Sequence, residues 1–157
     1  MIFFLFFNNL VCPNPGDSNS YTRAELISLA DVSDEASWLA KISLLLDEKS
    51  IDYLAPDCFT NLTQLKYLSL SGNSLSCLDE TIFKDLINLQ DLYLDKNQLT
   101  TISPSVFDNI NNINTIKIYI NGNPPALLGK SSAYYCNGKT KCVCYCSQDS
   151  ENNFKTC

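Results

Sequence analysis

Large apolar residues recur in the middle of the chain with a period of 24 residues, as from Leu65 to Leu89. Two successive units share seven apolar positions and one Asn in the same order, namely Leu65, Leu68, Leu70, Asn73, Leu75, Leu78, Phe83, Leu86 and then Leu89, Leu92, Leu94, Asn97, Leu99, Ile102, Phe107, Ile110. A weaker unit precedes them, with Lys41 and Lys49 in place of the first Leu and the Asn. After them, Ile113, Ile116, Ile118 and Asn121 continue the pattern before it stops. Repetition at a fixed period predicts a stack of similar coils.

Each unit contains the local signals of one such coil. The alternation at 68–70 and 92–94 predicts a short strand whose Leu side chains point inward. An Asn has both donors and an acceptor, so at the following turn it can satisfy backbone groups, and we expect a ladder of Asn73, Asn97 and Asn121. On the other side of the coil, Phe59, Phe83 and Phe107 are expected to stack. A continuous helix is disfavoured by the Gly, Asn and Pro residues that recur between the apolar positions.

The pattern LxxLxLxxNxLxxLxxxxFxxL over residues 41–123 resembles the 24-residue leucine-rich repeat of extracellular proteins. Toll-type receptors, small matrix proteoglycans and the lymphocyte receptors of jawless fish use this repeat. The resemblance implies an α/β fold, a short right-handed solenoid with a curved parallel sheet on its concave side. It also implies that this side binds another molecule. A single repeat cannot cover its own open faces, so caps are expected at both ends.

The flanking segments differ from the repeats. We expect residues 13–40 to form an irregular or helical N-terminal cap, because Thr22 and Glu25 have capping-box spacing and Trp38 can shield the first coil. Residues 124–157 are expected to form a Cys-rich C-terminal cap. Residues 1–12 contain an apolar run that is too short to span a bilayer. It is interpreted as a degenerate secretion signal or, alternatively, as a buried N-terminal strand.

The chain has eight Cys and no His. The even number favours disulfides and an extracellular, secreted location, whereas reduced thiols would indicate the cytoplasm. The disulfide candidates are Cys136, Cys142, Cys144, Cys146 and Cys157. A zinc site is the weaker alternative, because these spacings fit poorly with the usual ligand arms. Cys58 and Cys77 lie in adjacent coils, where they either pair with each other or remain small buried hydrophobic residues. Asn61 heads the sequon Asn61-Leu62-Thr63 and is a glycosylation candidate.

Charge and missing motifs exclude several classes of function. The net charge is −6 and the sequence pI is about 4.5, which disfavours nucleic-acid binding and anionic membranes. No segment is long enough for a membrane span. Without His and without a P-loop, GxSxG or dinucleotide fingerprint, we expect neither an enzyme nor a cofactor or metal site.

The residues between the inward Leu and Ile are the candidate ligand-binding residues. Read at the 24-residue period, they form three rows across the sheet: Ser43, Tyr67, Asp91, Thr115; Leu45, Ser69, Tyr93, Lys117; and Asp47, Ser71, Asp95, Tyr119. We expect a protein or peptide ligand, or a glycan, to contact the rows from Tyr67 to Tyr119. The alternative functions are a structural or matrix-assembly protein, a secreted inhibitor, or a metal-binding intracellular repeat protein. A last strand shifted by two residues, with Ile118, Ile120 and Asn123 inward, is also compatible and keeps Tyr119 outward.

Overall fold

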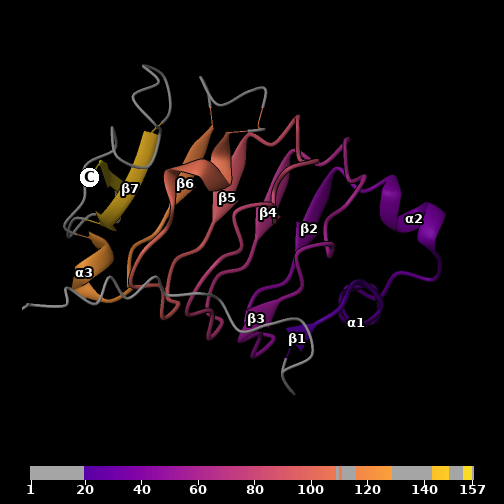
Figure 1. Cartoon of the computed structure of the whole chain (residues 1–157), viewed down its shortest axis with the longest axis horizontal. Coiled ribbons are helices and arrows are strands. Elements are labelled where there is room, and N and C mark those ends of the chain that lie inside the picture. Colours follow the sequence, from indigo (N-terminus) through magenta and orange to yellow (C-terminus); the bar gives the residue numbers. More distant parts are fainter. Residues whose placement is uncertain (1–19, 109, 111–115, 129–142, 149–153, 157) are drawn as a thin grey trace, which may run out of the picture.

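The computed structural model describes residues 20–108, 110, 116–128, 143–148 and 154–156. Their main feature is a sheet of short strands side by side (Figure 1). Its order is β2 (Ser43–Leu45), β4 (Tyr67–Ser69), β5 (Asp91–Tyr93), β6 (Lys117–Tyr119), β7 (Val143–Gln148) and β8 (Phe154–Thr156). The first five strands are parallel, and β8 is antiparallel to β7. One short strand per coil in a parallel sheet is the arrangement of an α/β repeat solenoid.

Smaller elements lie beside this sheet. Strands β1 (Ser20–Tyr21) and β3 (Tyr53–Leu54) pair in a second, two-stranded parallel sheet, which the sequence did not indicate. The helices α1 (Arg23–Leu29) and α2 (Glu35–Leu39) lie beyond β2 at the indigo end of the stack (Figure 1). The 3₁₀ turn η1 (Pro104–Phe107) follows β5, and the helix α3 (Pro125–Leu128) follows β6.

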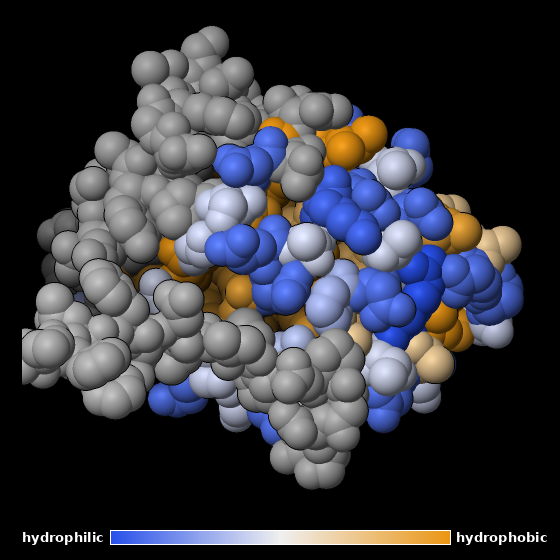
Figure 2. All heavy atoms as spheres, viewed as in Figure 1, coloured by the Kyte–Doolittle hydropathy of each residue, from blue (hydrophilic) through white to orange (hydrophobic). Residues whose placement is uncertain are grey.

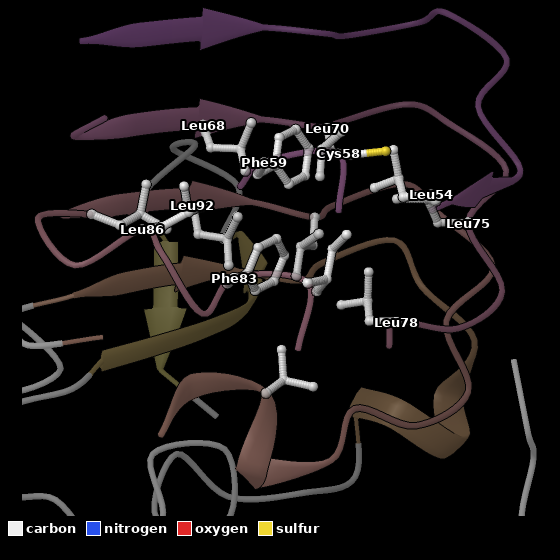
Figure 3. Packing of buried hydrophobic residues seen from close by; sticks show 14 of the residues in the cluster. Leu54, Cys58, Phe59, Leu68, Leu70, Leu75, Leu78, Phe83, Leu86 and Leu92 are labelled. Carbon is white, nitrogen blue, oxygen red and sulfur yellow. The ribbon is translucent and has the colours of Figure 1, made fainter. Parts of the chain in front are cut away.

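The core confirms the predicted inward positions. The Leu residues of the strands and of the following turns are buried in one cluster that runs through the coils. Phe59 and Phe83 are stacked with their ring centroids 6.2 Å apart, and Phe83 and Phe107 follow at 6.3 Å. Figure 3 shows Phe59 and Phe83 in successive coils, close to the Leu side chains of the strands. These contacts between coils give the stack a continuous apolar interior.

The Asn ladder is present, but its last member is Asn123, so the prediction of Asn121 was wrong. Asn73 accepts hydrogen bonds from the N–H groups of Lys49 and Ile51, each at 3.0 Å, and donates to Leu46 O at 2.8 Å. Asn97 makes the corresponding bonds one coil later, to the backbone of residues 75, 70 and 94. Asn123 makes them two coils later, to the backbone of residues 99, 94 and 120.

The physical reason is the length of the last interval. Leu68 pairs with Leu92 at the 24-residue period, but Leu92 pairs with Ile118, 26 residues further on. Two additional residues therefore lie between β5 and β6. They bring Asn123 to the ladder position and leave Asn121 outside the ladder.

The turn that follows each strand uses left-handed backbone. Glu48, Gly72, Lys96 and Gly122 occupy equivalent positions, with φ angles of 54°, 68°, 53° and 73°. A Cβ atom on Gly72 would lie 2.9 Å from Cγ of Glu48, which is closer than real Cβ atoms approach. Glycine at this position therefore both permits the positive φ and leaves room for the Glu48 side chain.

The segment before β2 folds back on the first coil. The capping box predicted for α1 is formed, since Glu25 N–H donates to Thr22 Oγ1 and Thr22 N–H donates to Glu25 Oε2. Arg23 Nη1 donates to Thr60 O at 2.5 Å, and Arg23 also pairs with Glu35 of α2. Trp38 is fully buried in the core cluster. The two helices are thereby tied to each other and to the repeats.

Cys58 carries a free, buried thiol whose Sγ donates to Tyr21 O at 2.8 Å, so it is not bonded to Cys77. Cys77 is disulfide-bonded, so the expectation that both remain small buried hydrophobic residues holds for Cys58 but was wrong for Cys77. Burial, with a smaller contribution from the nearby Asp57 charge, raises the pKa of this thiol to about 12. Cys144 and Cys146 fall within β7, and the other three disulfide candidates lie outside the described residues. Within the described part of the chain, no helix combines the length and apolarity needed to cross a membrane.

Candidate binding face

The outward side of β2, β4, β5 and β6 carries the predicted site residues, and we call it the tyrosine face. Strand pairing places Tyr67, Asp91 and Lys117 in one row and Ser69, Tyr93 and Tyr119 in the next. The second row begins at Leu45 of β2 and continues by backbone register to Tyr145 of β7. Side chains of one row are neighbours on the same face, so each row is a line of potential ligand contacts across the coils.

Three Tyr rings pack against one another on this face. Tyr93 and Tyr119 stack with their centroids 4.1 Å apart and an interplanar angle of 7°. Tyr67 approaches Tyr93 diagonally at 5.0 Å with a tilt of 35°. Each such contact contributes roughly 0.5–1.5 kcal/mol beyond area burial. Because Tyr93 has a ring on either side, the stack presents ring edges and hydroxyl groups rather than ring faces.

The Tyr93 hydroxyl is held in its neutral form. Burial raises the pKa of Tyr93 well above its usual value, and the neighbouring Tyr119 hydroxyl raises it further. Tyr93 therefore stays protonated across the physiological range and can both donate and accept a hydrogen bond.

Carboxylates flank the stack and are already oriented by neighbouring side chains. Ser69 Oγ donates to Asp47, and Ser71 Oγ donates to Asp95 Oδ2 at 2.5 Å. Asp91 Oδ1 lies 3.8 Å from Nζ of Lys117 in an ion pair that is partly accessible to solvent and therefore adds little stability. The face thus offers three carboxylates and one ammonium group around an apolar row.

The structure brings eight of the nine predicted ligand-binding residues to this face, and Thr115 lies outside the described residues. Two row assignments were wrong, because the additional residues before β6 shift it by two positions. Lys117 lies opposite Asp91 rather than Tyr93, and Tyr119 lies opposite Tyr93 rather than Asp95. The Tyr stack and the ion pair both follow from this shift. Both could have been predicted from the alternative register of the last strand, in which Asn123 takes the ladder position.

Accessibility differs among these residues. Ser69 is only 3% exposed and Tyr119 only 7%, so they support the face more than they offer area to a ligand. Tyr67, Ser71, Asp91, Tyr93 and Asp95 are half-buried, and Lys117 is exposed. Leu45, at the start of the second row, is 59% exposed. Figure 2 shows the mixed character of the molecular surface, with hydrophilic residues over the central coils and hydrophobic residues visible between them.

No grouping of three or more Cys, Asp or Glu side chains in the described residues is arranged to hold a metal ion. The polar groups of the tyrosine face are hydrogen-bonded hydroxyls and separate carboxylates. Their arrangement suits contact with a ligand surface.

A comparison with known families gives a match over most of the chain. The family described as "BspA type Leucine rich repeat region" matches residues 38–154, in six copies. The matched range starts three residues before the predicted repeats and extends past residue 123, through β7 to the start of β8. No curated protein matches the chain.

Proposed function

Because the chain belongs to the BspA-type leucine-rich-repeat family, and leucine-rich repeats generally mediate protein–protein interaction, we propose that it is a binding module. Its ligand is a protein or peptide that contacts the tyrosine face. The protein acts by binding rather than by catalysis.

The observation that carries this proposal is the packed row of Tyr67, Tyr93 and Tyr119 on the outward side of the sheet. Tyr is enriched in the centres of protein interfaces, where its ring gives contact area and its hydroxyl gives a directed hydrogen bond. The rings restrain one another before a ligand arrives. A ligand therefore loses less binding free energy to side-chain ordering than it would on a mobile surface.

The charges around the row indicate the character of the ligand. Asp47, Asp91 and Asp95 surround the rings, and among the described side chains Lys117 is the cation that pairs with one of them. Complementary charge steers association and sets register, so the ligand carries basic groups at the spacing of these carboxylates. From β2 to β6 the strands cover roughly 15 Å at about 4.8 Å per interval, which suits a short extended segment.

Selection of displayed random peptides on the purified protein tests this function. We expect the selected peptides to be rich in Lys and Arg and to lose at least about tenfold in affinity on Tyr93→Ala and Asp95→Asn proteins. Lys84→Ala changes an exposed residue away from the sheet and serves as the matched control. Peptides that bind the Tyr93→Ala protein as tightly as the wild type would refute the tyrosine face as the binding site.

We further propose that the protein is secreted and that its C-terminal Cys residues form disulfides. The Cys content supports this location, as does Asn61, an exposed residue in left-handed backbone (φ 63°) whose side chain is accessible to a glycan. Non-reducing peptide mass analysis of secreted material is the test. It should find Cys136, Cys142, Cys144, Cys146 and Cys157 oxidised together with the disulfide-bonded Cys77, which makes the number of bonded Cys even, and it should find Asn61 glycosylated. Thiols that are reduced throughout would instead indicate the cytoplasm.

A further inference from the structure

Among the described strands, β2 is an edge of the six-stranded sheet. Its hydrogen bonds to the second coil are made by even-numbered residues, since Ile42 O accepts from Lys66 and Tyr67, and Leu46 N–H donates to Ser69 O. The backbone groups of Ser43 and Leu45 therefore point away from β4. Among the described residues, no strand other than β4 pairs with β2. At the opposite end, β8 closes the order as an antiparallel strand.

Exposed apolar side chains are concentrated on the same edge. Ile42 and Leu45 are the large hydrophobic residues that stand out as exposed in the described part of the chain, at 59% each. Soluble proteins usually blunt a free edge with charge, Pro or a bulge, because unpaired backbone groups invite another strand. In the part of the chain that the structure describes, this edge presents backbone groups that pair with no other strand, together with exposed apolar side chains.

The charges along this edge are complementary to themselves. Lys41 precedes β2 and Asp47 follows it, both at odd positions, with Leu44 midway between them. The Lys41 side chain has no hydrogen bond or ion pair with any described residue. In an antiparallel pair of two β2 strands centred on Leu44, Lys41 of each copy comes to the same end of the pair as Asp47 of the other, although Lys41 itself lies at the end of α2, where its N–H donates to Trp38 O. A shift of two residues in either direction places Lys41 opposite Leu45 or Lys49 and removes both ion pairs.

We propose that β2 of this chain pairs antiparallel with β2 of a second copy, centred on Leu44, to form a dimer with one continuous sheet. Ser43 of each copy then exchanges backbone hydrogen bonds with Leu45 of the other, which satisfies the free edge. Leu45 packs against Ser43 across the pair on the outward side, and the two Lys41–Asp47 ion pairs fix the register.

This arrangement has a consequence for binding. The two-fold axis of an antiparallel strand pair is perpendicular to the sheet, so both tyrosine faces point to the same side. The dimer would present two copies of the face in one continuous surface, and a ligand with two binding segments would gain avidity from it. The dimer itself does not depend on the function proposed for the tyrosine face.

Sedimentation of the full chain over a concentration series tests the proposal. We expect a reversible monomer–dimer equilibrium that weakens at high salt. Lys41→Asp and Asp47→Lys should each weaken dimerisation at least about tenfold, because each places like charges opposite one another. An equimolar mixture of the two single variants should dimerise again, since each supplies the charge that the other lacks. The double variant Lys41→Asp/Asp47→Lys should also dimerise.

Asp95→Lys is the matched control. Asp95 accepts a hydrogen bond from a Ser hydroxyl, as Asp47 does, but it lies beyond β5 and away from the edge. This variant should dimerise like the wild type, and circular dichroism should show the same fold for every variant. A wild-type protein that stays monomeric would overturn the proposal. A monomer is also the result expected if residues 1–19 of the same chain, rather than a second copy, paired with β2. Single variants that dimerise normally, or a mixture that stays monomeric, would overturn it as well.

Discussion

Replacing Asn123 by Ala should destabilise the protein strongly, whereas replacing Asn121 by Ala should not. Asn123 is 5% exposed, and it accepts a hydrogen bond from Leu99 N–H at 3.0 Å and donates to Leu94 O and Ile120 O at 2.8 Å each. Asn121 Oδ1 is buried and has no hydrogen-bond partner among the described residues. The two residues have the same side chain and lie two positions apart, so the pair isolates the effect of the ladder position.

The magnitude follows from the groups that lose a partner. Leu94 O keeps a second bond from Asn97 Nδ2 at 3.0 Å, so Asn123→Ala leaves Leu99 N–H and Ile120 O without their side-chain partner. An unsatisfied buried polar group costs roughly 1–3 kcal/mol, which gives about 2–6 kcal/mol for the pair. That is a large part of the roughly 5–15 kcal/mol of a typical domain. Asn121→Ala removes an unsatisfied acceptor and should change the free energy of unfolding by less than about 0.5 kcal/mol.

Urea denaturation followed by circular dichroism and by the fluorescence of Trp38, the single Trp, measures both changes. The midpoint should fall for Asn123→Ala with an unchanged slope, which indicates lost stability rather than a different native state. A larger loss for Asn121→Ala than for Asn123→Ala would refute the reasoning. It would show that the last coil keeps the 24-residue period and that β6 is paired in the other register.

Three further outcomes are expected. Gly72→Ala should lower the free energy of unfolding, measured by urea denaturation, by about 1–2 kcal/mol, because Gly72 has a φ of 68° and the added Cβ would meet the Glu48 side chain. An unchanged free energy of unfolding would contradict the tight turn. Burial raises the pKa of the Cys58 thiol from its ordinary value of 9.0 to about 12. The thiol therefore ionises first in the unfolded chain, so wild-type stability should fall between pH 9 and 12, and Cys58→Ala should lack this loss. Parallel curves of stability against pH for the two proteins would refute the burial of the thiol. The Tyr93 phenol should ionise above the range of ordinary tyrosines, as seen by the difference in ultraviolet titration between wild type and Tyr93→Phe, and a normal titration would exclude the stacked arrangement with Tyr119.

The stacked coils could be predicted because their signals are independent of one another. Apolar spacing marked the inward residues, Phe59, Phe83 and Phe107 marked the spine, and Thr22 with Glu25 marked the start of α1. Each signal reflects burial or a local hydrogen bond, and both are encoded within a few residues. Their agreement is what a sequence that specifies one fold should show.

The register of β6 could not be predicted from the same signals. A strand shifted by two residues keeps the same side chains inward and outward, so hydrophobic patterning does not distinguish the two registers. Both registers place an Asn near the ladder, Asn121 or Asn123. The difference lies in hydrogen bonds to residues more than 20 positions earlier, such as Leu99 N–H. The pairing of β1 with β3 was missed for a related reason, because two-residue strands have no periodicity to read.

The two additional residues before β6 determine the chemistry of the tyrosine face as well as the ladder. In the 24-residue register, Lys117 would lie opposite Tyr93 and Tyr119 opposite Asp95, so the aromatic row would end at β5. In the observed register, Tyr119 stacks on Tyr93 and Lys117 reaches Asp91. The packing of the core does not depend on the register of β6, since Ile side chains fill the interior in either register. In a solenoid of this kind, the length of one coil can therefore change the binding surface while the apolar interior remains the same.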